Sequence, residues 1–371
     1  MKIKRKKLST VGTQTGRIDT SKPNLSNPPS SFIPLVQSGV WDLHRDGVTQ
    51  GLLANFLTCP EKCRLAAVEG LTQIRTGGAL AFGSLIHDVL DQVYSHVMRK
   101  KDCDNWETFT TAVMGIALRD KEKADRDAIN ERGGTDPEAL VMLEENYGMA
   151  EGILPGYLKK WSGDFNDVEW IALEQMFETP ITFQMEDGEE VTLTIRGKRD
   201  GVFRSRKSGR LYLFETKTKG RIDEDGIMDR LVFDLQVMLY LWSMWKDFGE
   251  MPQGVVYNIM RKPQLRQKKD ESLKQFIDRI RFDTEARPDF YYMRYNSDIV
   301  GSDLVEWEKE FILILRQLVR WYRGQFNWKN SGACAMGGFN CQFLPVCSRN
   351  DRSSFKTKEV PFPELTSGEV E

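Results

Sequence analysis

The segment RGKRDGVFRSRKSGRLYLFETK, residues 196–217, is the most informative part of the sequence. The residues on either side of its middle, Thr192–Arg204 and Leu211–Thr218, are rich in β-branched and aromatic side chains, which favour strands. Between them, residues 205–209 are polar and have the composition of a turn. The segment therefore predicts a β-hairpin whose turn centres near Lys207 and Ser208.

This hairpin would bring three charged side chains together. Antiparallel pairing around the predicted turn sets Asp200 opposite Glu215, with Cβ atoms about 4.5–5.5 Å apart, where like charges destabilise a sheet. Alternation along the second strand places Glu215 and Lys217 on one face. Facing carboxylates suit a hard divalent cation such as magnesium, and Lys217 could then position or help to deprotonate a metal-bound water beside a scissile phosphate. The alternative is a solvated face with ordinary ion pairs.

Length and composition narrow the class of protein. A chain of 371 residues with 40% hydrophobic content can form one large domain or two. Because there is no signal-like segment and no apolar run near the roughly 18 residues that span a bilayer, we expect a cytoplasmic protein without membrane contacts. The net charge of −2 gives no global basic field, so nucleic acid would have to bind local basic patches. Six cysteines without a secretory signal favour reduced thiols available to a metal.

The two ends differ in composition from the middle. Residues 1–39 begin with the basic run KIKRKK and continue with Ser, Thr, Pro and Asn, which predicts a disordered tail. The run could contact nucleic acid, act as a nuclear address, or only aid solubility. Residues 351–371 are also predicted to be disordered, which leaves residues 40–350 as the folded domain. Within it, the charged helical region of about residues 103–165 predicts an insert or cap over the core.

Two predicted helices carry further candidate residues. Ala79–Met98 has apolar residues at helical spacing, and His87 lies at the border of that apolar stripe. A hydrogen-bonded histidine at the edge of a core explains His87 as well as a metal ligand does. A helix from about Gly226 to Phe248 would place Gln236 and Tyr240 on one face, four residues apart.

A predicted strand and a basic segment follow. Residues 255–261, VVYNIMR, are typical of a strand, and residues 261–269 are rich in Lys and Arg. Together with the aromatic and basic run at 290–295, the basic segment could contact phosphates and stack on bases. A solvated loop followed by a core strand is the alternative.

Four motifs, taken in order, resemble those of the PD-(D/E)XK nuclease superfamily. The resemblance is to its RecB-like branch with a cysteine-bound iron–sulfur cluster, which includes AddB-type and CRISPR-associated exonucleases, and it covers roughly residues 50–350. The motifs are GSLIH at 83–87, GKRDG at 197–201, FETK at 214–217 and LQVMLY at 235–240. The resemblance implies an α/β, restriction-endonuclease-like fold: a mixed central sheet flanked by helices, with a helical insert and a cysteine cluster joining the N- and C-terminal parts.

The same resemblance implies roles for the motif residues. The ligands of Mg²⁺ or Mn²⁺ would be His87, Asp200, Glu215 and the carbonyl of Thr216. Lys217 would orient the attacking water, while Gln236 and Tyr240 would steady the substrate and the site. Glu174, in the predicted strand Val168–Phe183, is a further acidic candidate.

The cysteines extend the resemblance, because the branch has one cysteine before its core and three after it. Cys59, in the part 50–67, and Cys334, Cys341 and Cys347, in the part 330–350, would hold a [4Fe–4S] cluster. The spacing departs from the branch in one place, since its first two trailing cysteines usually follow a C-x2-C pattern. Cys63 lies one helical turn after Cys59, so a zinc site using both is an alternative. Cys103 is expected to be a free, buried thiol.

The resemblance implies a magnesium-dependent deoxyribonuclease. An exonuclease acting on single-stranded DNA or duplex ends in replication, recombination or repair, in a host or a virus, is favoured over a structure-specific endonuclease. The alternative from another class is a zinc- or cluster-stapled nucleic-acid-binding protein without cleavage activity. A protein with a decayed active site would be expected to lack Asp200, Glu215 or Lys217, and all three are present. A zinc-stapled adaptor would leave the motif order unexplained. No P-loop of the form GxxxxGK[ST] occurs, so any unwinding would need a separate helicase or recombination protein.

Overall fold

The computed structural model describes residues 39–74, 78–131, 136–299, 301–324, 327–336 and 339–365. The tail predicted over residues 1–39 lies outside these residues except for Gly39. The helices are α1 (Leu43–Asp46), α2 (Gln50–Thr58), α3 (Pro60–Cys63), α4 (Gly78–Lys100), α5 (Trp106–Glu131), α6 (Pro137–Lys160), α7 (Glu224–Leu231), α8 (Leu235–Phe248), α9 (Leu273–Ala286), α10 (Pro288–Tyr291), α11 (Gly301–Tyr322) and α12 (Leu344–Arg349). The strands are β1 (Val48–Thr49), β2 (Leu71–Gln73), β3 (Val168–Gln184), β4 (Glu190–Ser205), β5 (Leu211–Lys219), β6 (Gly254–Arg261), β7 (Tyr292–Asp298), β8 (Ala335–Met336), β9 (Phe339–Asn340) and β10 (Phe355–Thr357).

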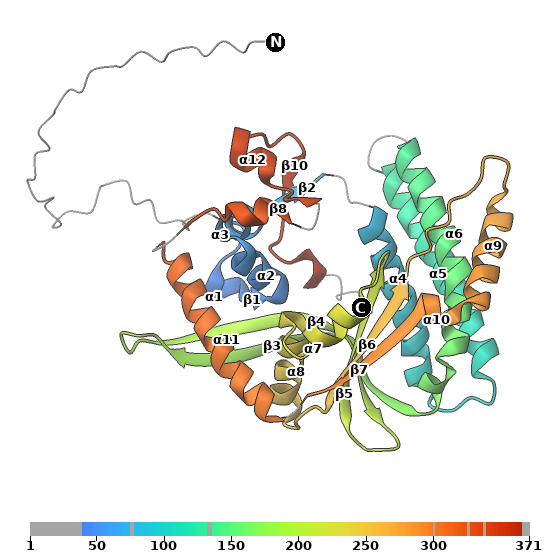
Figure 1. Cartoon of the computed structure of the whole chain (residues 1–371), viewed down its shortest axis with the longest axis horizontal. Helices are drawn as coiled ribbons and strands as arrows, with labels where there is room; N and C mark the ends of the chain where they lie inside the picture. The colour runs from blue at the N-terminus through green and yellow to red at the C-terminus, as the bar shows by residue number, and fades with distance from the viewer. Residues whose placement is uncertain are drawn as a thin grey trace, which may run out of the picture.

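A six-stranded mixed sheet forms the centre of the protein (Figure 1). Its order is β1-β4-β5-β6-β7, and β3 also pairs with β4. The pairs β3–β4, β4–β5 and β6–β7 are antiparallel, whereas β1–β4 and β5–β6 are parallel. The predicted α/β fold, a mixed central sheet flanked by helices, is confirmed.

The hairpin formed by β4 and β5 has the predicted register. Arg204 pairs with Leu211 and Gly201 with Phe214, which centres the turn between Lys207 and Ser208. Continued by one residue, this register sets position 200 across from position 215. The carboxylates of the two motifs therefore come from neighbouring strands.

The sheet separates two hydrophobic cores. One contains Phe203 and Phe214 together with side chains of α4, α5, α6 and α9, which gather on one side of the sheet in Figure 1. The other contains Val202 and Leu213 together with side chains of α8 and α11. Because neighbouring positions of the hairpin enter opposite cores, both of its faces are buried, as in a central strand. The backbone around the motifs is thus held from two sides.

The helix predicted from Gly226 to Phe248 is wrong in one respect, because it is divided into α7 and α8. Asp234 forms the break: its Oδ1 accepts hydrogen bonds from the backbone N–H groups of Gln236 and Val237, both at 3.0 Å. An aspartate favours such a cap over a helix interior because its side chain competes for backbone donors. The cap makes α8 begin immediately before Gln236.

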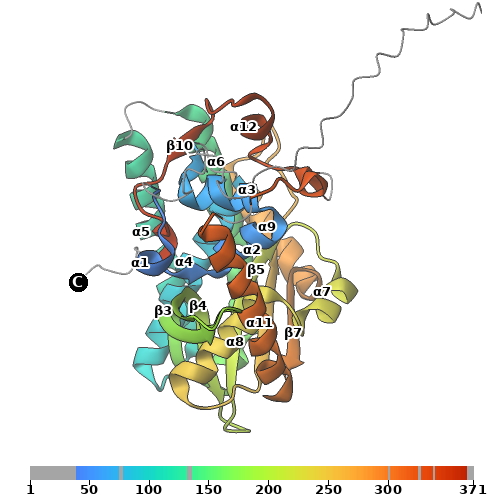
Figure 2. The same ribbon diagram turned by 90° about the vertical axis from the view of Figure 1, so that its left-hand side faces the viewer.

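The prediction of a disordered tail after residue 350 is wrong for residues 351–365. Strand β10 pairs antiparallel with β2, and Phe355 stacks on Phe343 with ring centroids 5.4 Å apart. In both Figure 1 and Figure 2, β10 and α12 lie at the same end of the molecule as α3. The partner strand is nearly the whole chain away, so local composition could not reveal it. Residues 366–371 lie outside the described part of the chain.

The helical region predicted as an insert, about residues 103–165, contains α5, α6 and a 3₁₀ helix at Ser162–Phe165. Its side chains share a continuous core with α4 and with the sheet. The region is therefore built into one face of the domain.

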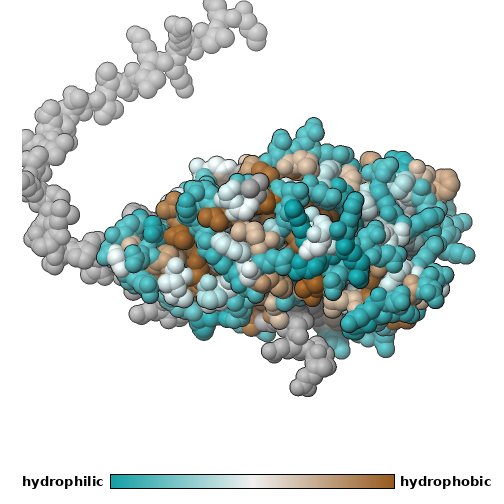
Figure 3. All heavy atoms as spheres, turned by 90° about the horizontal axis from the view of Figure 1, so that it is seen from below, coloured by the Kyte–Doolittle hydropathy of each residue, from teal (hydrophilic) through white to brown (hydrophobic). Residues whose placement is uncertain are grey.

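Polar residues dominate the face of the molecule shown in Figure 3, where hydrophobic residues form small separate groups. Scattered exposure of this kind is normal for folded proteins. Every helix within the described residues is too short or too polar to span a lipid bilayer.

The substitution Asp247→Ala should lower the free energy of unfolding by about 3–5 kcal/mol, the cost of leaving a buried charge unpaired. Arg199 is 1% exposed, and its guanidinium contacts Asp247 and donates to Ser243 Oγ at 2.8 Å. Urea denaturation measures the loss. The control is Glu189→Ala, which removes the partner of a more exposed arginine, Arg323, and should cost under about 1 kcal/mol. Equal losses in both variants would contradict the prediction.

Candidate active site and cysteine cluster

Three ligand-type side chains meet between α4 and the strands β3 and β4. His87, Glu174 and Asp200 offer ligand atoms that all lie within 4.8 Å of one another. The Nδ1 atom of His87 is 3.8 Å from Glu174 Oε1 and 3.6 Å from Asp200 Oδ1. The three side chains are 25%, 19% and 14% exposed, so solvent can reach the group. An imidazole and two carboxylates in this arrangement can bind a divalent cation.

Glu174 adopts a backbone conformation that is rare for its residue type. Its φ of 43° lies in the left-handed region, which costs a non-glycine residue about 1–3 kcal/mol. It falls between the pairs Leu173–Gly201 and Gln175–Arg199 of the β3–β4 ladder. Its Oε2 bonds to Lys198 Nζ at 2.5 Å. Because strain of this kind gathers at functional sites, it supports Glu174 as a member of this one.

Asp200 is fixed by the backbone of the next strand. Its Oδ2 accepts a hydrogen bond from the Thr216 N–H at 2.7 Å, while its Oδ1 faces His87. Burial raises the pKa of Asp200, although the charges of His87 and Lys217 oppose this shift. The contact with Thr216 determines where this carboxylate can bind a cation. That the Thr216 carbonyl is a ligand stays a prediction.

Glu215 lies outside the three-residue group, and its side chain is fully buried. Its Oε1 contacts Lys217 Nζ and accepts a hydrogen bond from Gln236 Nε2 at 2.8 Å. Among the described residues, no hydrogen-bond donor reaches its Oε2. Burial, and then the charge of Asp200, raise the pKa of Glu215 to about 7. A buried carboxylate oxygen without a partner is costly, and a cation shared with Asp200 would remove that cost, so the residues fit a metal ion.

Lys217 places an ammonium group beside Glu215. Burial works against its ammonium group, but the charges of Glu215 and Asp200 outweigh burial and raise the pKa of Lys217. Lys217 therefore keeps its proton at neutral pH. Its side chain is 29% exposed, so the ammonium group can also reach a bound molecule.

Helix α8 supplies the last two predicted residues. The cap at Asp234 sets its first turn, from which Gln236 reaches Glu215. Tyr240 packs edge-on against Phe177, with ring centroids 5.5 Å apart. Burial, and then the charge of Glu215, raise the pKa of Tyr240, so its phenol stays neutral. The structure thus brings all predicted site residues of the strands and of α8 into one region, and their catalytic roles stay predictions.

The substitution His87→Ala should weaken metal binding more than it lowers the melting temperature. His87 contributes one of three converging ligand groups, and removing a group that binds or orients a metal typically costs about 10- to 100-fold in affinity. Manganese titration and thermal melting separate the two effects. The matched control is His96→Ala, a partly exposed histidine of the same helix that lies outside the three-residue group, and it should change neither value. Unchanged metal affinity with a lower melting temperature would assign His87 to the edge of the core.

Sequence reasoning missed the polar residues behind the site. Asn258 on β6 is fully buried and donates a hydrogen bond to Thr216 Oγ1 at 3.2 Å. One signal was present, because in VVYNIMR an asparagine interrupts an otherwise mainly apolar strand. A buried amide needs hydrogen-bond partners, so such a residue points to a polar neighbour.

The predicted cluster cysteines lie in one lobe, the cysteine lobe, which the part around Cys59 and the part around Cys334, Cys341 and Cys347 form together. Cys59 stands between α2 and α3, and its Sγ accepts the Asn330 N–H at 3.3 Å. The Cys341 N–H donates to the Cys334 carbonyl at 2.8 Å. Cys341 and Cys347 pack against a third small core. Burial raises the pKa of Cys347, and the nearby Glu61, Cys341 and Cys59 contribute to the shift.

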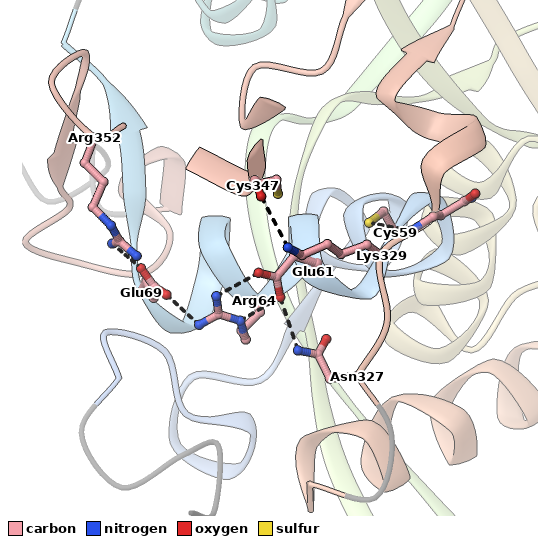
Figure 4. Close-up of polar contacts among 9 residues, drawn as sticks. Cys59, Glu61, Arg64, Glu69, Asn327, Lys329, Cys347 and Arg352 are labelled. Carbon is pink, nitrogen blue, oxygen red and sulfur yellow. Dashed lines mark hydrogen bonds and ion pairs between the residues drawn. The ribbon is translucent and has the colours of Figure 1, made fainter. Parts of the chain in front are cut away.

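A chain of ion pairs ties this lobe together (Figure 4). Arg64 binds both oxygens of the buried Glu61, at 2.8 and 2.9 Å, and reaches Glu69 at 2.5 Å. Glu69 in turn binds Arg352 at 2.5 Å, and Asn327 donates to Glu61 at 3.1 Å. Residues 61–69 are thereby linked to two separate C-terminal segments.

Cys63 has a different environment. Its side chain is fully buried in the main core, its Sγ donates to the Leu52 carbonyl at 3.7 Å, and burial strongly raises its pKa. This disfavours the thiolate that zinc requires. Tetrahedral zinc with Zn–S bonds of about 2.3 Å would also hold its sulfurs within about 4 Å of one another. Within the described residues, the group around His87 is the only set of three or more such side chains whose ligand atoms all lie within 4.8 Å of one another. Cys103, expected to be buried, is partly exposed.

The family model described as the PD-(D/E)XK nuclease superfamily matches residues 48–348. A crystal structure of a protein from Eubacterium rectale, described as "Putative exonuclease", is 13% identical and has a TM-score of 0.41, covering 86% of this chain and 92% of that one. No curated protein is significantly similar to the chain.

Proposed function

The chain belongs to the PD-(D/E)XK nuclease superfamily, and from this membership we propose that it is a magnesium-dependent deoxyribonuclease acting as an exonuclease on DNA ends. The observation that carries the proposal is the buried Oε2 of Glu215. This oxygen has no hydrogen-bond partner among the described residues, and Asp200 raises the pKa of Glu215 from the neighbouring strand. A divalent cation shared with Asp200 would give this oxygen a partner.

In the proposed reaction the residues divide three tasks: holding the cation, orienting the water and fixing a ligand in place. Asp200, Glu215 and His87 would hold a divalent cation, which supplies Lewis acidity to the phosphate that is cut. Lys217 keeps its proton, so it orients the attacking water and compensates negative charge on the phosphate. Gln236 holds Glu215 in place through its 2.8 Å hydrogen bond.

The preference for DNA ends has its own support. It rests on the resemblance of the four motifs and of the cysteine pattern to the branch whose members mostly trim or resect DNA. The same resemblance favours a role in replication, recombination or repair. Since the sequence has no helicase P-loop, duplex unwinding would require a separate helicase or recombination protein.

We further propose that Cys59, Cys334, Cys341 and Cys347 hold a [4Fe–4S] cluster. All four are free thiols of one lobe and are partly accessible, as cluster assembly requires. The burial of Cys63 in the main core disfavours the zinc alternative that would use this thiol.

Digestion of end-labelled DNA tests the function. Single- and double-stranded substrates, each linear or circular, are incubated with and without Mg²⁺. We expect magnesium-dependent loss of linear DNA and intact circles. Cleavage of circles at the same rate would establish an endonuclease instead, and binding of DNA without any cleavage would establish the non-catalytic alternative.

A further inference from the structure

We propose that Asn258 is a positioning residue, which fixes Thr216 and through it holds the Asp200 carboxylate in the orientation that binds the metal. The inference rests on the proposed function, because it assigns a new residue to the same metal site. It arises from a buried hydrogen-bond network that none of the sequence motifs contains.

The hydrogen bonds of Asn258 fix the orientation of its amide group. Its Nδ2 donates to Thr216 Oγ1 at 3.2 Å and to Tyr157 Oη at 3.0 Å, which uses both of its N–H groups. Its Oδ1 accepts a hydrogen bond from Arg294 Nε at 3.0 Å. A flipped amide would turn its NH₂ group toward Arg294, which can only donate. Asn258 can therefore present only a donor to Thr216.

Thr216 transmits this constraint to the site. It lies beside Asn258 in the β5–β6 ladder and is 3% exposed. Its hydroxyl is held by Asn258, while its backbone N–H holds Asp200 Oδ2 at 2.7 Å. A threonine side chain is stiff at χ1, so fixing the hydroxyl also fixes the backbone from which the N–H projects. Two hydrogen bonds thus separate Asn258 from the carboxylate.

On the side of Asn258 away from Thr216, the network ends at a buried ion pair. Arg294 binds both oxygens of Asp164 at 2.6 Å, and the side chains are 11% and 10% exposed. Tyr94 on α4 donates to Asp164 Oδ2 at 2.6 Å, and Tyr157 on α6 accepts from Arg294 at 3.1 Å. Because α4 also carries His87, the network joins two of the elements that carry metal ligands.

If the role of Asn258 were only structural, its substitution would have a different effect. Each buried hydrogen bond stabilises the fold by about 0.5–1.5 kcal/mol wherever it lies, so its loss lowers the melting temperature alone. A positioning role also changes the affinity for the metal. Outer-shell partners of metal ligands typically contribute about 10- to 100-fold to metal affinity.

The experiment compares full-length variants by calorimetric titration with Mn²⁺, thermal melting and magnesium-dependent cleavage. Asn258→Ala should raise the Mn²⁺ Kd and the magnesium concentration for half-maximal cleavage together, by about 10- to 100-fold. Thr216→Val removes the hydroxyl at nearly constant volume and should do the same, while Thr216→Ser should restore both values. Thr110→Ala, which loses a buried hydroxyl bonded only within α5, should lower the melting temperature and leave the Kd unchanged.

The outcomes are distinguishable. Wild-type Mn²⁺ affinity in folded Asn258→Ala or in Thr216→Val would overturn the positioning role and leave the proposed nuclease intact. A wild-type protein that neither binds Mn²⁺ nor cuts DNA would overturn the proposed function and this inference with it.

Discussion

Asp200→Asn should leave the protein folded and remove its nuclease activity. We expect the cleavage rate to fall by at least about 100-fold, the upper range for losing even an outer-shell group of a metal site. The carboxylate loses its charge while its volume and its contact with the Thr216 N–H are largely retained. Timed digestion of end-labelled DNA at saturating Mg²⁺ measures the effect. The control is Asp187→Asn, an exposed turn carboxylate that should have no effect.

Substitutions of Lys217 and Glu215 test the same site. Lys217→Ala should slow cleavage by about 10²- to 10⁴-fold, the range for a group that positions or transfers a proton. Glu215→Gln should abolish cleavage and raise the melting temperature of metal-free protein, because it removes a buried charge whose Oε2 has no partner in the described chain. Wild-type-like activity in purified Asp200→Asn or Glu215→Gln protein would refute the assigned site.

Cys347→Ser should destabilise the whole domain when the protein is prepared without oxygen. Structural metal sites contribute about 10–16 kcal/mol in zinc fingers, as much as the entire stability of an ordinary domain, about 5–15 kcal/mol. We expect wild-type protein to be brown and to contain iron and sulfide in comparable amounts. In the variant, both should fall and the melting temperature should drop by about 10 °C or more, since each kcal/mol shifts it by about 2–4 °C in domains of about 150–250 residues.

Other cysteines provide the controls. Cys103→Ser should retain the colour and nearly the wild-type melting temperature, because Cys103 lies apart from the cysteine lobe against the helical core. Cys63→Ser should lose stability without losing iron, since that thiol lies in the main core. A colourless wild-type protein with stoichiometric zinc would overturn the cluster in favour of the zinc alternative.

The parts of the fold that could be predicted depend on local patterns. The hairpin register followed from strand composition on both sides of a polar turn, and it placed Asp200 and Glu215 on adjacent strands. The local sequence also contains the signal for the break in the predicted helix at Asp234, because an aspartate before an apolar run is a common N-cap. Helical periodicity outweighed that signal because the apolar residues of α7 and α8 continue across the break.

The parts that could not be predicted depend on partners far away in the chain. Strand β10 is polar and short, and only its pairing with β2 and the stacking of Phe355 reveal it. The partners of Asn258 come from α6, β5 and β7, which the sequence places far from one another. A buried asparagine can be suspected from its apolar neighbours, but its partners can be identified only in the folded chain.

The linkage of the cysteine lobe has a consequence for the order of events during synthesis. Cys59 lies 271 residues before its partner Asn330, and Glu69 lies 283 residues before Arg352. A ribosome adding about 5–20 residues per second needs roughly 15–55 s to make that interval. During this time the first thiol and the edge of β2 have left the ribosome without their partners, and an unpaired strand edge is open to wrong pairing. Insertion of the proposed cluster would therefore follow synthesis of both ends, because the contact between Glu69 and Arg352 can form only after residue 352 has been made.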